Sequence, residues 1–186
     1  MKLVVIKSKE CKVALCCTGC LIIMSLWFAV RTGEILVFDL LKSALLIILS
    51  YTAMIFDINT KRIPNTLILI MIAGWLILII PMMFIDTENG INQMVDSLYG
   101  LLSGGGLFLL VYMISNKGLG GGDVKFMAAA GLYLGFAGTI PAILCGTVLA
   151  ALAGLVLIIL KKIRRKDTIP LVPFLFAGIM ITIIVP

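Results

Sequence analysis

Long apolar runs separated by short polar segments are the feature that most limits how this chain can fold. A run of about 20 apolar residues can cross the hydrocarbon core of a bilayer as an α-helix, and one such run extends from Val13 to Val30. Hydrophobic residues make up 62% of the 186 residues, and the mean hydropathy is +1.22, outside the range of soluble globular domains. Because the spans use up most of the chain, any chemistry must lie in short loops or at helix ends.

The order of apolar and polar segments predicts an all-α membrane protein with about seven transmembrane helices, a six-helix core preceded by an N-terminal helix. We expect one integral membrane domain over residues 1–186, in which 1–34 form a basic segment with an extra span and 40–186 form the core. The predicted spans are Val13–Val30, Ile35 or Leu40 to Phe56, Thr66–Ile85, Ser97–Ser115, Asp123–Gly138, Pro141–Leu160 and a short last span after Pro173.

The positions of the basic residues predict which loops face the cytoplasm, because cytoplasmic loops hold most of the Lys and Arg residues of membrane proteins. With the N-terminus inside, all fifteen Lys and Arg residues except Arg31 and Lys42 fall on inner segments. The chain is therefore expected in the inner (plasma) membrane as a multi-pass protein with its N-terminus in the cytoplasm. In this topology Asp57, at the end of the second span, and Asp123, at the start of the fifth, both face the cytoplasm.

The residue inventory excludes several kinds of chemistry. The chain has no histidine, which removes Ser-His-Asp and Cys-His arrangements and the commonest metal ligand. Cys17 and Cys20 have the spacing of a zinc or redox pair, but no second pair completes four ligands, so the cysteines fit better as small buried side chains. We expect no metal and no cofactor. The net charge is +6, but the basic residues do not form a face on which aromatic residues alternate with them. The expected partner is therefore the lipid bilayer and not a nucleic acid.

Asp57 and Asp123 form a candidate dyad. Asp123 follows the glycines Gly120 to Gly122 and begins an apolar helix, whereas Asp57 ends one. Two carboxylates that share a site cannot both ionise cheaply, so one keeps its proton while the other acts as a base. Such a pair can activate a water that attacks a peptide carbonyl and can donate to the developing oxyanion. Helix polarity favours negative charge on Asp123, near a helix N-terminus, and so predicts that Asp57 holds the proton.

These residues also have plainer interpretations. An aspartate at a membrane interface can be a solvated loop residue, and a glycine run can be a flexible turn rather than room for an extended substrate strand. Lys125 can contact lipid phosphate. Two other functions remain open, a proton-coupled transporter and a non-catalytic scaffold in a secretion complex. A transporter should show charged or amide residues in the middles of several spans, and those segments are almost wholly apolar.

Three motifs taken together resemble the type IV prepilin leader peptidase family, membrane aspartyl proteases of the GxGD class. The stretch Gly120-Gly121-Gly122-Asp123-Val124-Lys125 matches the family's GxGDxK and is followed by an Ala/Gly-rich helix. Asp57 with Arg62-Ile63-Pro64-Asn65 matches its D-x-x-x-x-R-x-I-P-N pattern, with one position fewer between the acid and the basic residue than in some spacings. The segment Ile169–Gly178 is similar to IPFGPFLALG, with Val172 in place of a glycine. The resemblance covers Leu40 to the C-terminus.

The resemblance implies an aspartic endopeptidase that cuts the basic leader from prepilins or pseudopilins at the cytoplasmic membrane face. It implies that Asp57 and Asp123 are catalytic and that pilus or secretion machinery is a partner. Larger members also methylate the new N-terminus through an insert between the first two spans. Here that connection is only Thr32 to Glu34, so we expect the short form without methyltransferase activity. The residues implied in substrate binding or motif support are Gly120, Gly121, Gly122, Lys125, Arg62, Pro64 and Asn65.

Overall fold

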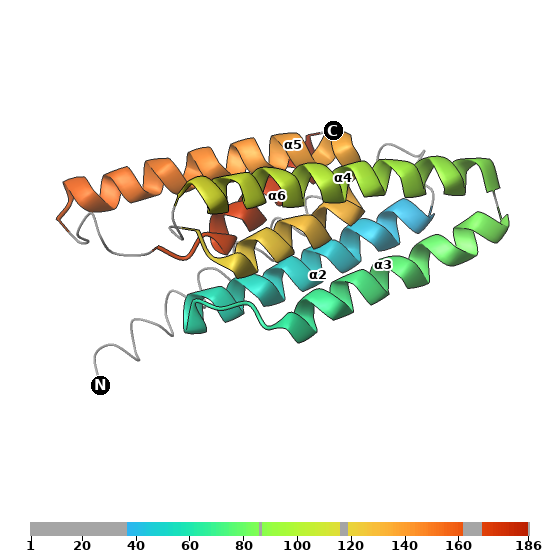
Figure 1. Cartoon of the computed structure of the whole chain (residues 1–186), viewed down its shortest axis with the longest axis horizontal. Helices are drawn as coiled ribbons and strands as arrows, with labels where there is room; N and C mark the ends of the chain where they lie inside the picture. Colours follow the sequence, from blue (N-terminus) through green and yellow to red (C-terminus); the bar gives the residue numbers. More distant parts are fainter. Residues whose placement is uncertain (1–36, 86, 116–118, 162–168, 186) are drawn as a thin grey trace. The chain divides into compact units, whose positions relative to one another are not determined.

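The computed structural model describes residues 37–85, 87–115, 119–161 and 169–185, which belong to one compact unit, Val37–Pro186. This part is all-α, as the sequence predicts, and four of its helices are long and apolar enough to cross a membrane (Figure 1). The predicted span Val13–Val30 lies outside the described residues, so the count of seven spans stays a prediction. The helices are α2 (Val37–Thr60), α3 (Asn65–Ile85), α4 (Thr87–Ile114), α5 (Gly121–Ile159) and α6 (Val172–Ile184).

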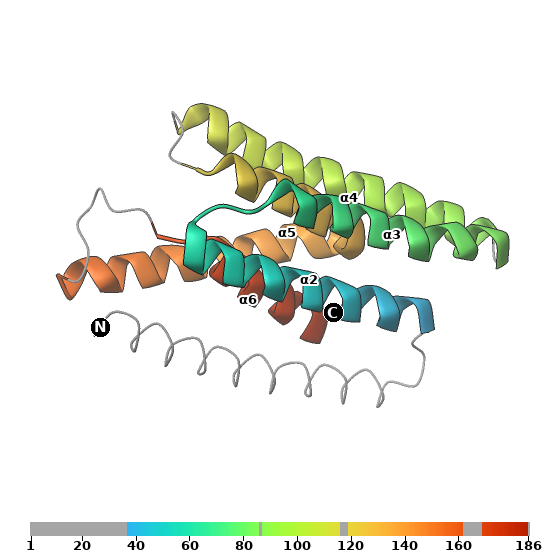
Figure 2. The same ribbon diagram turned by 90° about the horizontal axis from the view of Figure 1, so that it is seen from below.

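The helices alternate in direction along the bundle, as Figures 1 and 2 both show. The C-terminal end of α2 and the N-terminal ends of α3, α5 and α6 therefore gather at one end of the bundle, on the left in Figure 1. The N-terminal ends of α2 and α4 lie at the opposite end. This arrangement places the polar segments that carry Asp57 and Asp123 on the same side of the apolar bundle.

α5 contains a reversal of the chain at Gly135. Gly135 has φ 68° and ψ −177°, which are not helical, and the two halves of α5 run in opposite directions on either side of it (Figure 2). A positive φ is easily adopted only by glycine. The halves correspond to the predicted spans Asp123–Gly138 and Pro141–Leu160, but the predicted break between them was too late in the sequence. The helix already resumes after Gly135, so Pro141 lies inside the second half.

The two helix boundaries near polar residues also differ from the prediction. α2 does not stop before Asp57 but continues to Thr60, where Lys61 adopts a left-handed φ of 52° and its N–H donates to the Asp57 carbonyl (2.8 Å). α4 does not begin near Ser97 but at Thr87, so most of the stretch between the predicted spans Thr66–Ile85 and Ser97–Ser115 is helical. The polar residues Thr87, Glu88 and Asn89 form an exposed first turn of α4 and not a loop.

α4 and α5 approach each other through glycines. A Cβ on Gly100 would overlap the carbonyl oxygen of Gly131, and a Cβ on Gly131 would overlap that of Gly100. A Cβ on Gly104 would lie 2.6 Å from the Met127 carbonyl oxygen. Small residues that let helix backbones touch are a common basis of helix association in membranes. Gly104 therefore allows the two helices to approach closely, whereas Gly106 faces open space.

Two hydrogen bonds between buried side chains and their neighbours add to this packing. The Tyr133 hydroxyl of α5 donates to the Met71 carbonyl oxygen of α3 (2.6 Å), and Trp75 Nε1 of α3 donates to Ser97 Oγ of α4 (3.2 Å). In an apolar bundle each bond removes the cost of an unpaired polar atom. α3 is thereby held against both α4 and the first half of α5.

We expect Gly131→Ala to destabilise the protein by about 2 kcal/mol, because the new methyl group forces α4 and α5 apart. The matched control is Gly106→Ala, also in a helix but with nothing near the new Cβ, which should be neutral or stabilising by up to about 1 kcal/mol. Thermal unfolding of the detergent-solubilised variants measures the difference. Equal stabilities for the two variants would show that the glycine contact does not hold the helices together.

Candidate active site

Asp57 is buried at the last turn of α2, with 5% of its surface exposed. Its Oδ2 accepts a hydrogen bond from the backbone N–H of Val172 (3.1 Å), the first residue of α6. The first N–H groups of any helix have no partner within that helix, and a carboxylate is a favourable partner for them. Asp57 therefore caps α6 from a helix that lies far away in the sequence.

Asp123 lies in the first turn of α5 and is partly buried. Its backbone N–H donates to the Gly120 carbonyl oxygen (3.1 Å), and a Cβ on Gly120 would lie 3.0 Å from Asp123 Oδ2. The carboxylates of Asp123 and Asp57 are near enough for their charges to interact. The structure thus brings together the two aspartates that the sequence singles out, at the end of the bundle where α2 ends and α5 and α6 begin.

Helix polarity does not distinguish the two carboxylates as the sequence suggests. The sequence argument considers only the helix to which each aspartate belongs, and so places Asp57 at a negative helix end. In the structure the side chain of Asp57 meets the N-terminus of α6, where backbone N–H groups favour negative charge. The assignment of the shared proton to Asp57 therefore no longer follows from helix polarity.

The glycines before Asp123 hold the start of α5 close to the loop between α2 and α3. A Cβ on Gly122 would meet the Ile63 Cβ at 3.4 Å and the Ile63 backbone nitrogen at 3.5 Å. Gly121 is exposed, and nothing lies within 4 Å of the place a Cβ would take. Gly122 therefore permits packing within the protein, while Gly121 leaves its backbone accessible from outside.

Lys125 and Asn65 join the two sequence motifs directly. Lys125 Nζ donates to Asn65 Oδ1 (3.0 Å), which links the N-terminal parts of α5 and α3. Pro64 precedes α3, and its carbonyl oxygen accepts from the Leu67 N–H (3.0 Å). Arg62 is exposed in the same loop. All the residues of the two motifs therefore lie at the end of the bundle that carries Asp57 and Asp123.

Sequence reasoning missed the part that Val172 plays. Val172 contributes a backbone amide, which any residue except proline can supply, so its side chain carries no signal of the role. The available signal was Pro170 and Pro173, since prolines near a helix start mark where unpaired N–H groups lie. Within the described residues no group of three or more His, Cys, Asp or Glu side chains is placed to hold a metal ion.

Comparison with known proteins identifies the family of the chain. The model of the type IV leader peptidase family matches residues 44–159, a stretch that contains both aspartates. The chain belongs to the type IV leader peptidase family. No solved structure matches it. The family match ends before α6, so the Val172 amide that binds Asp57 comes from outside the matched stretch.

Two relatives in this leader peptidase family carry the same name. The chain is 31% identical over 140 residues to the prepilin leader peptidase/N-methyltransferase of Escherichia coli (strain K12), covering 71% of this chain and 57% of the relative. It is 32% identical over 139 residues to the prepilin leader peptidase/N-methyltransferase of Bacillus subtilis (strain 168), covering 73% of this chain and 50% of the relative. The chain therefore spans about half the length of the curated relatives it matches.

We expect Asp57→Asn to keep the fold of the protein, because the amide oxygen of asparagine can still accept the Val172 N–H. Asp57→Leu has the same branched arrangement of heavy atoms, with bulkier methyl groups and no acceptor, so it leaves that buried N–H unpaired and should be less stable than Asp57→Asn by about 1 to 2 kcal/mol. Chemical unfolding of both variants in detergent measures the difference. A leucine variant as stable as the asparagine variant would show that the hydrogen bond contributes nothing to holding α6.

Proposed function

We propose that this member of the family is an aspartic endopeptidase that removes the basic leader peptide from prepilins or pseudopilins. The single observation that carries the proposal is the meeting of Asp57 and Asp123 from different helices, with interacting charges, at one end of an apolar bundle. Paired carboxylates perform acid and base roles in peptide hydrolysis without a metal or histidine. Family membership and the names of the two relatives support the same reaction.

In the proposed mechanism the two carboxylates share one proton. The ionised member of the pair removes a proton from a water molecule, whose oxygen attacks the carbonyl carbon of the leader peptide bond. The protonated member donates a hydrogen bond to the carbonyl oxygen as negative charge develops on it. Transfer of a proton to the amide nitrogen then releases the leader. The Val172 amide keeps the Asp57 carboxylate oriented throughout, because it holds Oδ2 from the N-terminus of α6.

We propose that the end of the bundle with the two aspartates faces the cytoplasm. Lys61, Arg62 and Lys125 lie at this end, in keeping with the excess of basic residues on cytoplasmic segments. An enzyme with this orientation meets its substrate at the inner membrane face, where the leader joins the hydrophobic helix of a prepilin. The product then passes to the pilus or secretion machinery that assembles it.

The exposed backbone at Gly121 supports binding of an extended peptide. An extended substrate is recognised through main-chain hydrogen bonds, and these need a protein backbone that no side chain covers. Gly121 is exposed, and even an added Cβ would touch nothing. The prepilin backbone on either side of the scissile bond can therefore approach the first turn of α5, beside Asp123.

The proposal is tested by cleavage of a model prepilin by the purified full chain. We expect Asp57→Asn and Asp123→Asn each to lower kcat by about 10³-fold, because each removes one partner of the acid-base pair. The control is Glu88→Gln, an exposed carboxylate in the first turn of α4, which should cleave like the unaltered protein. Full cleavage by either aspartate variant would contradict the mechanism, and absence of cleavage by the unaltered protein would favour the non-catalytic scaffold.

We also infer that this chain acts as a peptidase without N-methyltransferase activity. The inference rests on the sequence, in which only Thr32 to Glu34 separate the first two predicted spans; these residues lie outside the described part of the structure. Incubation of the purified protein with a prepilin and methyl-labelled S-adenosylmethionine should give cleaved pilin without label. The prepilin peptidase/N-methyltransferase of either relative serves as the positive control, and labelled pilin from this chain would refute the inference.

A further inference from the structure

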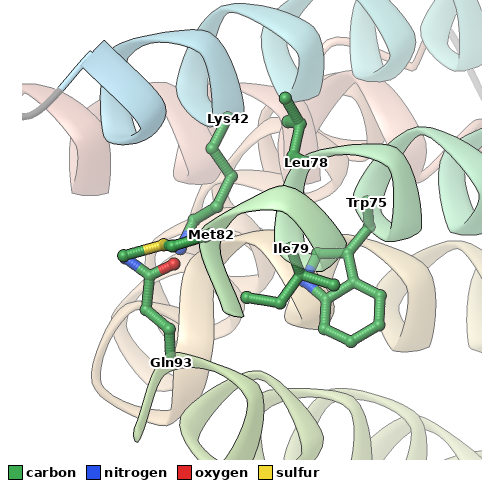
Figure 3. A pocket seen from close by; sticks show the side chains of 6 residues that line it. All are labelled: Lys42, Trp75, Leu78, Ile79, Met82 and Gln93. Carbon is green, nitrogen blue, oxygen red and sulfur yellow. The ribbon is translucent and has the colours of Figure 1, made fainter. Parts of the chain in front are cut away.

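Four polar side chains cluster at the end of the bundle opposite Asp57 and Asp123. They are Asp39 and Lys42 of α2 and Gln93 and Asp96 of α4, and we call them the polar clamp. Gln93 Nε2 donates to Asp39 Oδ1 (2.9 Å), and Lys42 lines the same pocket as Gln93. Lys42 and Gln93 point toward each other across a pocket whose other lining residues come from α3 (Figure 3). The proposed reaction uses none of these residues.

The polar clamp extends to the reversal in α5 through Asp96. Asp96 Oδ1 accepts the backbone N–H of Phe136 (3.0 Å), the first residue after Gly135. The carboxylate therefore caps the second half of α5 and lies where a Cβ on residue 135 would be. Because Gln93 of α4 donates to Asp39 of α2, α2 is connected through α4 to the point where α5 turns back.

The two helix segments that carry the site aspartates both extend between the polar clamp and the site. α2 runs from Lys42 to Asp57, and the first half of α5 runs between Gly135 and Asp123. At about 1.5 Å per residue, each carboxylate lies about 20 Å along its helix from the clamp. α2 contacts α5 less extensively than it contacts α3 or α6, so the relative position of the two segments also depends on the other helices and on the polar clamp.

We propose that the polar clamp is a positioning device that sets the separation of the Asp57 and Asp123 carboxylates. Charged side chains within spans are costly and are kept where they perform a task. Here the task is to hold α2 and the α5 reversal together, so that the helix ends that carry Asp57 and Asp123 keep a constant separation. The catalytic consequence rests on the proposed function, whereas the structural consequence does not. Lys42 and Asp96 are therefore positioning residues, and the reacting groups remain the two site aspartates.

The test measures the separation of the two helix ends and the kinetics in the same full-length protein. Spin labels are attached at cysteines placed at Ile58 of α2 and Gly121 of α5, both exposed, in a background in which the five native cysteines are replaced by serine. We expect Lys42→Met to lengthen and broaden the label distance, and Lys42→Arg to restore it. The matched control is Lys161→Met, an exposed lysine after α5, which should leave the distance unchanged.

The kinetic measurement uses the same substitutions without labels. We expect Lys42→Met to lower kcat about 10-fold or more with KM within about twofold of the original, because misplacement of reacting groups by a fraction of an ångström slows the chemical step more than binding. If Lys42→Met does not fold, Asp39→Asn/Lys42→Met removes one charge of each sign and is expected to show the same changes. Unchanged distances in a folded variant would overturn the proposal. If Lys42→Met alters the label distance but the unaltered protein cuts no prepilin, the result would support the clamp and contradict the proposed function.

Discussion

A carboxylate enclosed by apolar helices needs a hydrogen-bond donor, and the rest of this site depends on how Asp57 obtains one. The donor is the first backbone N–H of α6, which would itself be unpaired without the carboxylate. One bond thus meets two requirements and fixes the end of α2 against the start of α6. It also keeps α6, a short apolar helix from the last part of the described chain, beside the site. The environment of Asp57 is therefore set by a segment outside the stretch that the family model matches.

The second carboxylate reaches the same place because α5 can turn back and still pack closely. Backbone contact between Gly100 and Gly131 brings the first half of α5 onto α4, and the positive φ of Gly135 reverses the chain without a separate loop. Asp96 accepts the N–H that the reversal leaves unpaired. As a result the first half of α5 is short, and Asp123 begins it at the end where α2 finishes. Small residues and one capping carboxylate therefore allow the chain to reverse its direction without a longer loop.

Much of this arrangement could be predicted from the sequence, because it follows from local patterns. The apolar runs predict the helices, and the basic residues predict that Asp57 and Asp123 share one side. What could not be predicted depends on contacts between distant segments. The Val172 amide has no side-chain signal, and Asp96 looked like a residue before a span because the start of α4 was placed at Ser97 instead of Thr87. The bond between Lys125 and Asn65 likewise requires the relative position of α3 and α5.

The central claim is that Asp57 and Asp123 meet at one end of the bundle, and cross-linking tests this most directly. Cysteines introduced as Asp57→Cys and Asp123→Cys into the full chain without its native cysteines would be treated in native membranes with a short bifunctional thiol reagent. The structure predicts an intramolecular cross-link in high yield for this pair. It predicts none for the pair Asp123→Cys and Lys42→Cys, because Lys42 lies at the far end of α2. Failure of the first pair to cross-link while both cysteines react singly with the reagent would contradict the account.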